Sequence, residues 1–384
     1  MRRNRLQETV NPAHLQHMIR TPTLAPLPAG LPDSVPFVGP ETLERQRGAP
    51  FHARLGANEN GFGPSPRAIA AMQAEAVEVW KYGDPTNHDL RAALAAHAGA
   101  TPDHVVVGEG IDTLLGLAVR LLVGPGDTVV TSLGGYPTFD FHVTGFGGQL
   151  DRVPYREDMQ DPAALIARAR AVGARMVYLC NPDNPMGGWH PPGVIESALA
   201  GLPDDIVLIL DEAYAEFAPA LPQIDRDDPR ILRMRTFSKG YAMAGARIGY
   251  ALGAPDMMRA FDRVRNHFGV NRIGQAGALA ALADSDHLAQ TVARVAAARN
   301  RIAQIARDNG LAPLPSATNF VTIDCGADGD FARATLSALA ERGVFARMPW
   351  VAPQNRCIRV SCGPAAELDA FATALPDALA AAGS

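Results

Sequence analysis

Short β-branched runs that alternate with helix-forming stretches limit this chain to a few folds. Helix-forming stretches at residues 113–122 and 161–172 lie between several of these runs. This alternation is typical of βαβ units, in which the strands run parallel and helices cover both faces of the sheet. The sequence therefore predicts an α/β fold with a mostly parallel sheet and a ligand at the carboxyl ends of its strands. The expected strands are residues 104–108, 127–132, 175–180, 206–210 and 231–237.

The length of 384 residues exceeds what one hydrophobic core usually supports, so we expect a large domain and a smaller one. Residues 21–50 are rich in proline and polar groups, which predicts an extended arm that lies across a neighbouring segment or a partner subunit. Two probable strands, residues 316–325 and 356–362, belong to the smaller domain. We divide the chain into an N-terminal arm, a small α+β domain made of two segments, and a large domain, at residues 1–50, 51–75 with 285–384, and 76–284.

Composition and charge argue against several classes of protein. The formal net charge of −5 gives no basic face for nucleic acid, and no apolar run approaches the roughly 20 residues that cross a membrane. The first twenty residues begin with arginines but have no apolar region after them, so a secretory signal is not expected. The four cysteines show neither a CxxC pair nor nearby paired histidines, which predicts no metal site and reduced, buried thiols in a cytoplasmic protein.

The chain contains only two lysines beside 33 arginines, and one of the two, Lys239, lies in the stretch RTFSKGYAMAGARIGY. A lysine amine can lose its proton when it is buried and can then condense with a carbonyl, whereas a guanidinium stays charged. Thr236, Ser238 and Arg247 add two hydroxyls and a cation, a set that suits a phosphate dianion. The alternative is a lysine without a chemical role, as is expected of Lys81.

Other polar residues follow the expected strands. Asp211 comes after an apolar run, where an unpaired carboxylate is costly, so a cation should lie against it. That cation could be a protonated pyridine nitrogen or an arginine in a structural ion pair. Tyr136 could stack on a planar cofactor or be ordinary packing. Asn184 could donate to a phenolate oxygen or simply form a turn.

Residues 108–116, GEGIDTLLG, follow an expected strand and begin a helix. Thr113 stands where the dinucleotide pattern GxGxxG has its third glycine, which weakens the interpretation as a dehydrogenase. The first N–H groups of the helix could still bind a phosphate, and a tight turn without a ligand is the alternative. In the tail, Arg347 and Arg359 could point into one cleft and bind a carboxylate or phosphate, although each alone would be an ordinary surface arginine.

Nine ordered segments together resemble the fold-type I pyridoxal-phosphate aminotransferases, and among them the histidinol-phosphate aminotransferases. Between Leu55 and Gly363 these are NENGFGPSP, KYGDP, GEGID, YPTF, NPDNPMG, DEAY, TFSKGYAMAGARIGY, TNF and IRVSCG. The resemblance implies a three-layer large domain, a smaller α+β domain, pyridoxal 5'-phosphate as cofactor, and a homodimer. The chain departs from the family pattern at three positions and one segment, which are Gly61, Gly83, Met186 and residues 265–271.

The resemblance also implies a role for individual residues. Lys239 would form the imine with the cofactor and move the proton, while Asp211 would pair with the pyridine nitrogen. Tyr214 and Asn184 would contact the phenolic oxygen, and Tyr136 would stack on the ring. The cofactor phosphate would be bound by Ile111, Asp112, Thr236, Ser238, Arg247 and, from the other subunit, Tyr82.

Substrate binding and activity complete what the resemblance implies. Arg359 and Arg347 match the positions that contact the substrate anion, and Asn319 lies in the matching TNF segment. The implied reaction moves an amino group from an amino acid or amino-alcohol phosphate, histidinol phosphate included, to 2-oxoglutarate. A pyridoxal-phosphate decarboxylase of a phosphorylated amino acid and a non-catalytic cofactor-binding protein stay open as alternatives.

Overall fold

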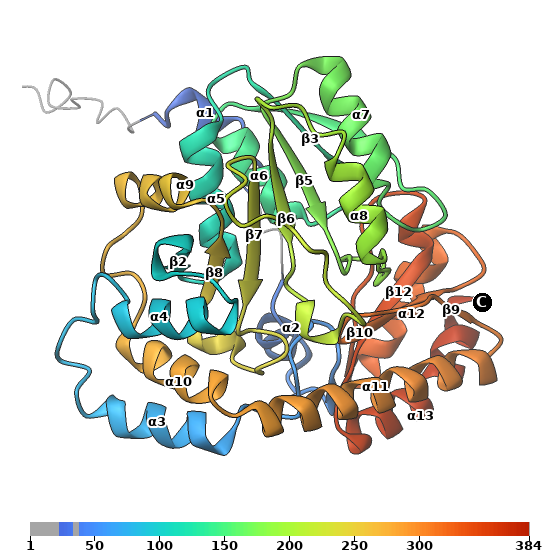
Figure 1. Cartoon of the computed structure of the whole chain (residues 1–384). Coiled ribbons are helices and arrows are strands. Elements are labelled where there is room, and N and C mark those ends of the chain that lie inside the picture. The colour runs from blue at the N-terminus through green and yellow to red at the C-terminus, as the bar shows by residue number, and fades with distance from the viewer. Residues whose placement is uncertain (1–22, 34–37, 384) are drawn as a thin grey trace, which may run out of the picture.

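The computed structural model describes residues 23–33 and 38–383. It contains a large sheet flanked by helices and a smaller region of strands and helices, and helix α11, Ser285–Asp308, extends along both (Figure 1). Within the described part of the chain, no helix is both long and apolar enough to span a membrane.

Seven strands form the large sheet. The five expected strands are all present, and β3 to β7 run parallel. β8 pairs antiparallel with both β2 and β7, so the prediction of a mostly parallel sheet is confirmed. In spatial order the strands are β2 (Val105–Gly108), β8 (Gly249–Leu252), β7 (Ile231–Thr236), β6 (Val207–Asp211), β5 (Met176–Cys180), β3 (Thr128–Ser132) and β4 (Gln149–Val153).

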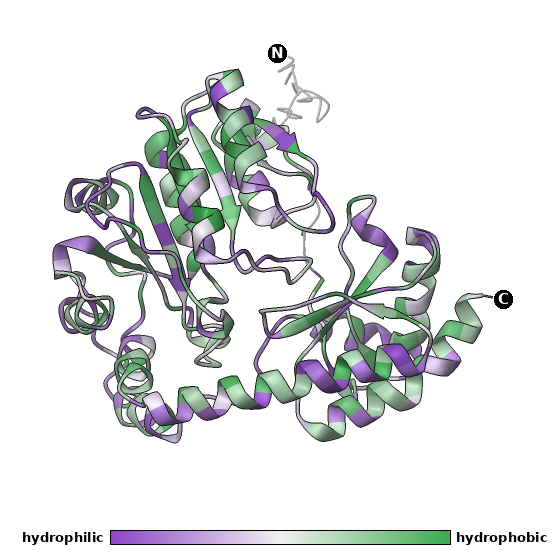
Figure 2. Cartoon of the chain, turned by 45° about the vertical axis from the view of Figure 1, so that its right-hand side comes forward, coloured by the Kyte–Doolittle hydropathy of each residue, from purple (hydrophilic) through white to green (hydrophobic). Residues whose placement is uncertain are grey.

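Helices cover both faces of this sheet, which gives three layers. One face carries α5 (Ile111–Leu122), α6 (Pro137–Gly145) and α9 (Pro255–Ala260), which share a core with alternate strand residues such as Val106. On the other face lie α7 (Pro162–Val172) and α8 (Pro192–Leu199), together with α4 (His88–His97) and α10 (Arg272–Leu282). α3 (Pro66–Ala76) packs against α10. The central strands are coloured mainly as hydrophobic in Figure 2, as expected for strands that are buried on both faces.

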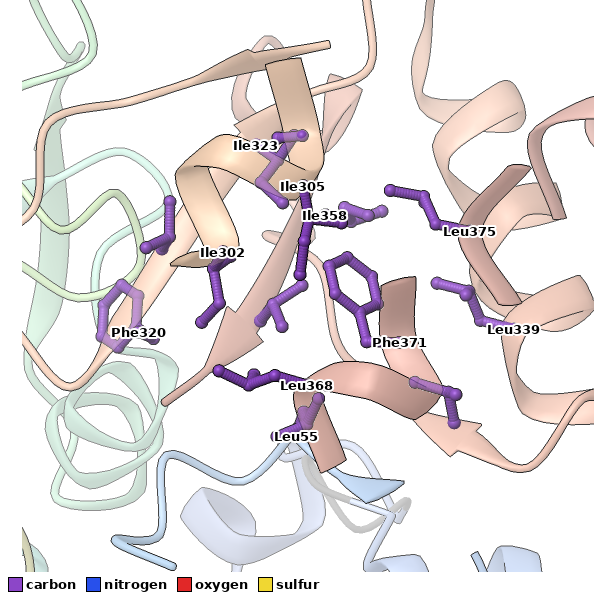
Figure 3. Packing of buried hydrophobic residues seen from close by; sticks show 14 of the residues in the cluster. Leu55, Ile302, Ile305, Phe320, Ile323, Leu339, Ile358, Leu368, Phe371 and Leu375 are labelled. Atoms are coloured by element: carbon purple, nitrogen blue, oxygen red, sulfur yellow. The ribbon is translucent and has the colours of Figure 1, made fainter. Parts of the chain in front are cut away.

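The smaller region has its own core. β12 (Cys357–Ser361), β10 (Phe320–Asp324) and β9 (Ala312–Pro313) form an antiparallel sheet, and β1 (Ala53–Arg54) pairs with β11 (Val344–Phe345). α11, α12 (Gly329–Glu341) and α13 (Ala365–Ala382) cover them. Leu55, Ile302, Ile358 and Phe371 pack together in this core (Figure 3), so the start and the end of the described chain are joined.

The proline-rich segment is not an extended arm where the structure describes it. It forms α1 (Pro26–Ala29) and α2 (Pro40–Arg47), and each helix begins with its proline in the first turn. Proline fits there because the first helical N–H has no intrahelical partner. Glu41 pairs with Arg54, and the N–H of Phe51 donates to Glu44 at 2.9 Å. Helix α2 therefore packs against the small region of the same chain. The expectation for residues 21–22 and 34–37 lies outside the described residues.

Candidate active site

A cavity of about 390 Å³ lies between the large sheet and the small region, at the carboxyl ends of β5, β6 and β7. Among the predicted site residues, only Tyr82 and Asn319 do not line it. The predicted residues that do line it are Ile111, Asp112, Tyr136, Asn184, Asp211, Tyr214, Thr236, Ser238, Lys239, Arg247, Arg347 and Arg359. The site thus draws on residues from seven separate stretches of sequence.

Lys239 lies in the loop between β7 and β8. Its Nζ donates a hydrogen bond to the carbonyl oxygen of Asn58 at 2.9 Å. Burial, together with the positive charge of Arg359, lowers the pKa of Lys239 to about 8. A substantial share of this amine is therefore neutral in mildly alkaline solution, which a nucleophilic amine requires.

Asp211 ends β6 and is only 4% exposed. Tyr178 donates its hydroxyl to one carboxylate oxygen at 2.6 Å, and the N–H of Ala213 donates to the other at 2.9 Å. No arginine or lysine of the described residues forms an ion pair with it, so the alternative of a structural ion pair is wrong. Burial raises the pKa of Asp211 to about 6, and a cation that entered the cavity would remove much of this cost.

A hollow kept open by glycine lies at the start of α5. Gly110 has a φ of +87°, and a Cβ there would lie 2.6 Å from Nη2 of Arg247. The Thr236 hydroxyl donates to the Ser238 hydroxyl at 2.9 Å. Backbone N–H groups at a helix start, two hydroxyls and a guanidinium together suit a phosphate group.

The opposite wall of the cavity carries two arginines. Nη1 of Arg359, on β12, donates to Oδ1 of Asn184 at 2.5 Å. Burial lowers the pKa of Arg359 to about 10, and nearby Arg347 acts in the same direction. Two cations on one wall, one of them mostly buried, favour an anionic ligand.

Comparison with known proteins identifies the family. The family model "Aminotransferase class I and II" matches residues 53–375. The chain belongs to this family. Histidinol-phosphate aminotransferase 1 of Mesorhizobium japonicum is 38% identical over 344 residues, which cover 87% of this chain and 92% of the relative. The histidinol-phosphate aminotransferase of Sinorhizobium meliloti, solved in complex with pyridoxal-5'-phosphate, is 53% identical with a TM-score of 0.91, over 94% of this chain and 99% of that chain.

The aminotransferase holds Tyr136 at the mouth of the same hollow. Its hydroxyl donates to Oδ1 of Asp112, in the first turn of α5, at 2.7 Å. Burial and the Asp112 carboxylate raise the pKa of Tyr136 well above its usual value, so the phenol stays protonated. This bond fixes the ring, which lines the cavity.

Two predicted residues of the aminotransferase lie elsewhere. Tyr82 is 81% exposed, and its ring centroid lies 4.9 Å from that of Phe268. Asn319 is fully buried behind the cavity, where its amide donates to the carbonyl oxygens of Asn58 at 3.0 Å and Glu59 at 3.2 Å. Asn319 therefore holds a lining segment and does not line the cavity itself.

Sequence reasoning missed three residues of the aminotransferase site. Asn58 is the first residue of the segment NENGFGPSP, but its position in the sequence does not indicate its contacts with Lys239 and Tyr214. Tyr178 lies in an expected strand, and because a hydroxyl in a buried apolar strand needs a polar partner, its bond to Asp211 could have been anticipated. Trp350 lines the cavity mouth and is 64% exposed, which only the structure can show.

Proposed function

We propose that this chain is a pyridoxal-phosphate-dependent aminotransferase that takes an amino group from a donor with an anionic end and passes it to 2-oxoglutarate. Histidinol phosphate is the first donor to consider, because the relatives cited above are named for it. The observation that carries the proposal is a buried amine, Lys239, in the same cavity as a buried carboxylate, Asp211, that has no cation beside it. The interpretation as a dehydrogenase is set aside.

The residues present fit the cofactor at three points. The lone carboxylate of Asp211 suits a protonated pyridine nitrogen. The hollow at Gly110, beside Arg247, suits the phosphate. Lys239 supplies an amine that can react with the aldehyde. Bound pyridoxal phosphate would supply an electron sink for the charge that develops at the substrate Cα.

The residues of the chain then have distinct tasks. Lys239 is the general base and acid at the substrate Cα, and its pKa of about 8 suits proton transfer in both directions near neutral pH. Asp211 would keep the ring nitrogen of a bound cofactor charged. Tyr214 and Asn184 would donate hydrogen bonds to its phenolic oxygen, and Arg359 holds Asn184 by its amide oxygen.

Anion recognition is assigned to Arg359 and Arg347. A donor phosphate or carboxylate and the distal carboxylate of 2-oxoglutarate would bind in turn to the same wall. A guanidinium pairs with carboxylate and phosphate through two parallel hydrogen bonds, so the same two side chains serve both substrates.

A single-turnover experiment tests the proposal. Purified wild-type protein loaded with the cofactor should convert it to the amino form when histidinol phosphate is added without any keto acid. K239A should lose the borohydride-reducible visible absorbance and the turnover, whereas K81R should keep both. Release of carbon dioxide without the amino form would indicate the decarboxylase, and no spectral change with any donor would indicate a non-catalytic protein.

Assembly and location complete the proposal. Exposed apolar side chains follow α3 at Val77, Trp80 and Tyr82, and the exposed ring of Phe268 packs against Tyr82. Such exposed apolar side chains favour burial against a second copy of the chain. In a homodimer of this kind, Tyr82 would reach the phosphate in the partner's site. The four cysteines are buried and unpaired, which suits the reducing cytoplasm.

A further inference from the structure

Asn58 has a backbone conformation that non-glycine residues rarely adopt. It lies in the loop between β1 and α3, its φ is +54°, and it is 3% exposed. Asparagine tolerates the left-handed region better than most residues, yet a non-glycine residue stays there only where its surroundings fix it.

Neighbouring residues of the small region fix Asn58 from several sides. Its N–H donates to the hydroxyl of Ser361 at 3.0 Å, and that hydroxyl lies 3.3 Å from Oδ1 of Asn58, to which it donates. Nδ2 of Asn319 donates to the carbonyl oxygen of Asn58 at 3.0 Å. The N–H, the side-chain oxygen and the carbonyl are all engaged, so the loop has little freedom to turn.

The carbonyl oxygen held in this way receives the amine of Lys239. The Nζ to oxygen distance is 2.9 Å, and the two residues are far apart in sequence. A fixed acceptor defines where the amine lies and favours its charged form, which opposes the effect of burial.

The side chain of Asn58 acts on a second group of the site. Its Nδ2 donates to the hydroxyl oxygen of Tyr214 at 3.0 Å. Because that oxygen accepts from Asn58, the phenolic hydrogen does not point at Asn58 and is available to a ligand in the cavity. Burial raises the pKa of Tyr214, so the phenol keeps this hydrogen.

We propose that Asn58 is the positioning residue that sets the direction of two proton-bearing groups, the Nζ of Lys239 and the hydroxyl of Tyr214. The inference rests on the proposed function, which makes both groups part of the catalytic machinery. It adds Asn58, a residue of the cavity wall, as one that acts through these two groups.

The lysine content of the chain allows a direct test. With ¹³C-labelled lysine, the protein gives only two lysine Cε signals in an NMR spectrum, and K81R assigns the signal of Lys239. In N58G, glycine accepts the left-handed conformation, but the amide and its bonds to Ser361 and Tyr214 are lost. The backbone carbonyl of residue 58 remains in this variant, but it is held less firmly once the side-chain bonds are gone. The pKa of Lys239 in the cofactor-free protein should therefore fall by about half a unit or more, because its ammonium has a less well placed acceptor.

Kinetics give a second readout. In N58G, kcat for the amino donor should fall about tenfold or more while KM changes less than about twofold, because Asn58 bonds to Lys239 and Tyr214 and not to the anion-binding arginines. S361A, which loosens Asn58 without removing it, should change both the titration and kcat in the same direction by a smaller amount. This second variant keeps the test open if N58G folds poorly.

A matched control is available at Asn87. It has a φ of +51°, is 3% exposed and lies at the N-cap position of α4 without a side-chain capping bond, and it does not line the cavity. N87G should leave the titration of Lys239 and kcat as in the wild type. If N58G and S361A behave like N87G in both readouts, the proposal is wrong. Because the titration uses cofactor-free protein, this outcome is distinct from failure of the proposed function, which K239A reports.

Discussion

Arg347 and Arg359 exchange backbone hydrogen bonds, with N to O distances of 3.2 and 2.5 Å. This isolated antiparallel bridge beside β12 brings both guanidinium groups to one wall of the cavity. Arg359 also reaches across to Asn184, which follows β5 of the large sheet. The anion-binding wall and the cofactor side are therefore joined by one side chain.

Replacing Arg359 should weaken both functions of that side chain. R359A is expected to lower kcat/KM for 2-oxoglutarate by about 30-fold to 160-fold, as for the loss of a charged hydrogen bond worth about 2 to 3 kcal/mol. R359K keeps the charge but cannot form two parallel bonds, so it should fall in between. Steady-state kinetics measure both variants, and an unchanged kcat/KM in R359A would remove Arg359 from substrate binding.

Asp211 predicts an unusual pH dependence of stability. Its pKa is raised from 3.8 to about 6 on folding, so the folded state binds this proton more tightly than the unfolded state. The free energy of unfolding of cofactor-free protein is therefore reduced as the pH rises from about 4 to 6, by about 3 kcal/mol at most. Above pH 6 the reduction is complete.

D211N removes this carboxylate and should separate stability from activity. Urea denaturation of cofactor-free protein at pH 7.5 should show D211N to be more stable than the wild type, and the difference should shrink toward pH 4.5. Transamination should fall by several orders of magnitude, because nothing would keep the ring nitrogen charged. A variant that is equally destabilised at both pH values would contradict the account of Asp211 as a carboxylate that lacks a cation.

Gly110 offers a test of the phosphate hollow with a close control. G110A would place a methyl group against Arg247 in a left-handed conformation, so the dissociation constant of the cofactor should rise about tenfold or more. Gly126 has a φ of +89°, close to the +87° of Gly110, but nothing lies within 4 Å of a Cβ there. G126A should show a similar backbone cost and unchanged cofactor binding, and equal effects in the two variants would argue against the hollow.

The sequence predicted the strands with continuous apolar runs better than the others. β5 and β6 are continuous apolar runs because both of their faces are covered. β4 has the polar sequence QLDRV at the sheet edge, and β8 is a short GYAL segment, so neither carried a strand signal. Helix α2 was missed because its proline was read as a breaker, although Pro40 occupies the first turn.

Some residues of the candidate site could be predicted from the sequence, and others could not. Residues at strand ends, such as Asp211, could be predicted because the carboxyl ends of parallel strands meet at one edge. The contacts of Asn58 with Lys239 and Asn319 join segments that are distant in the chain, and no local spacing encodes them. These contacts form because the small region packs against the large sheet, and the sequence alone does not show that packing.

The proposed homodimer predicts that two inactive variants will restore each other's activity. Y82A lacks the tyrosine that each subunit would lend, and K239A lacks the amine. In a mixed dimer, one site would combine Lys239 of the Y82A chain with Tyr82 of the K239A chain and would be intact, while the other site would lack both. Random reassembly of equal amounts makes half of the dimers mixed, so about a quarter of wild-type activity should appear.

The measurement is turnover after mild denaturation and joint refolding, with each variant refolded alone as the control. If the mixture is no more active than its parts while a tagged copy pulls down an untagged one, Tyr82 does not act across the interface.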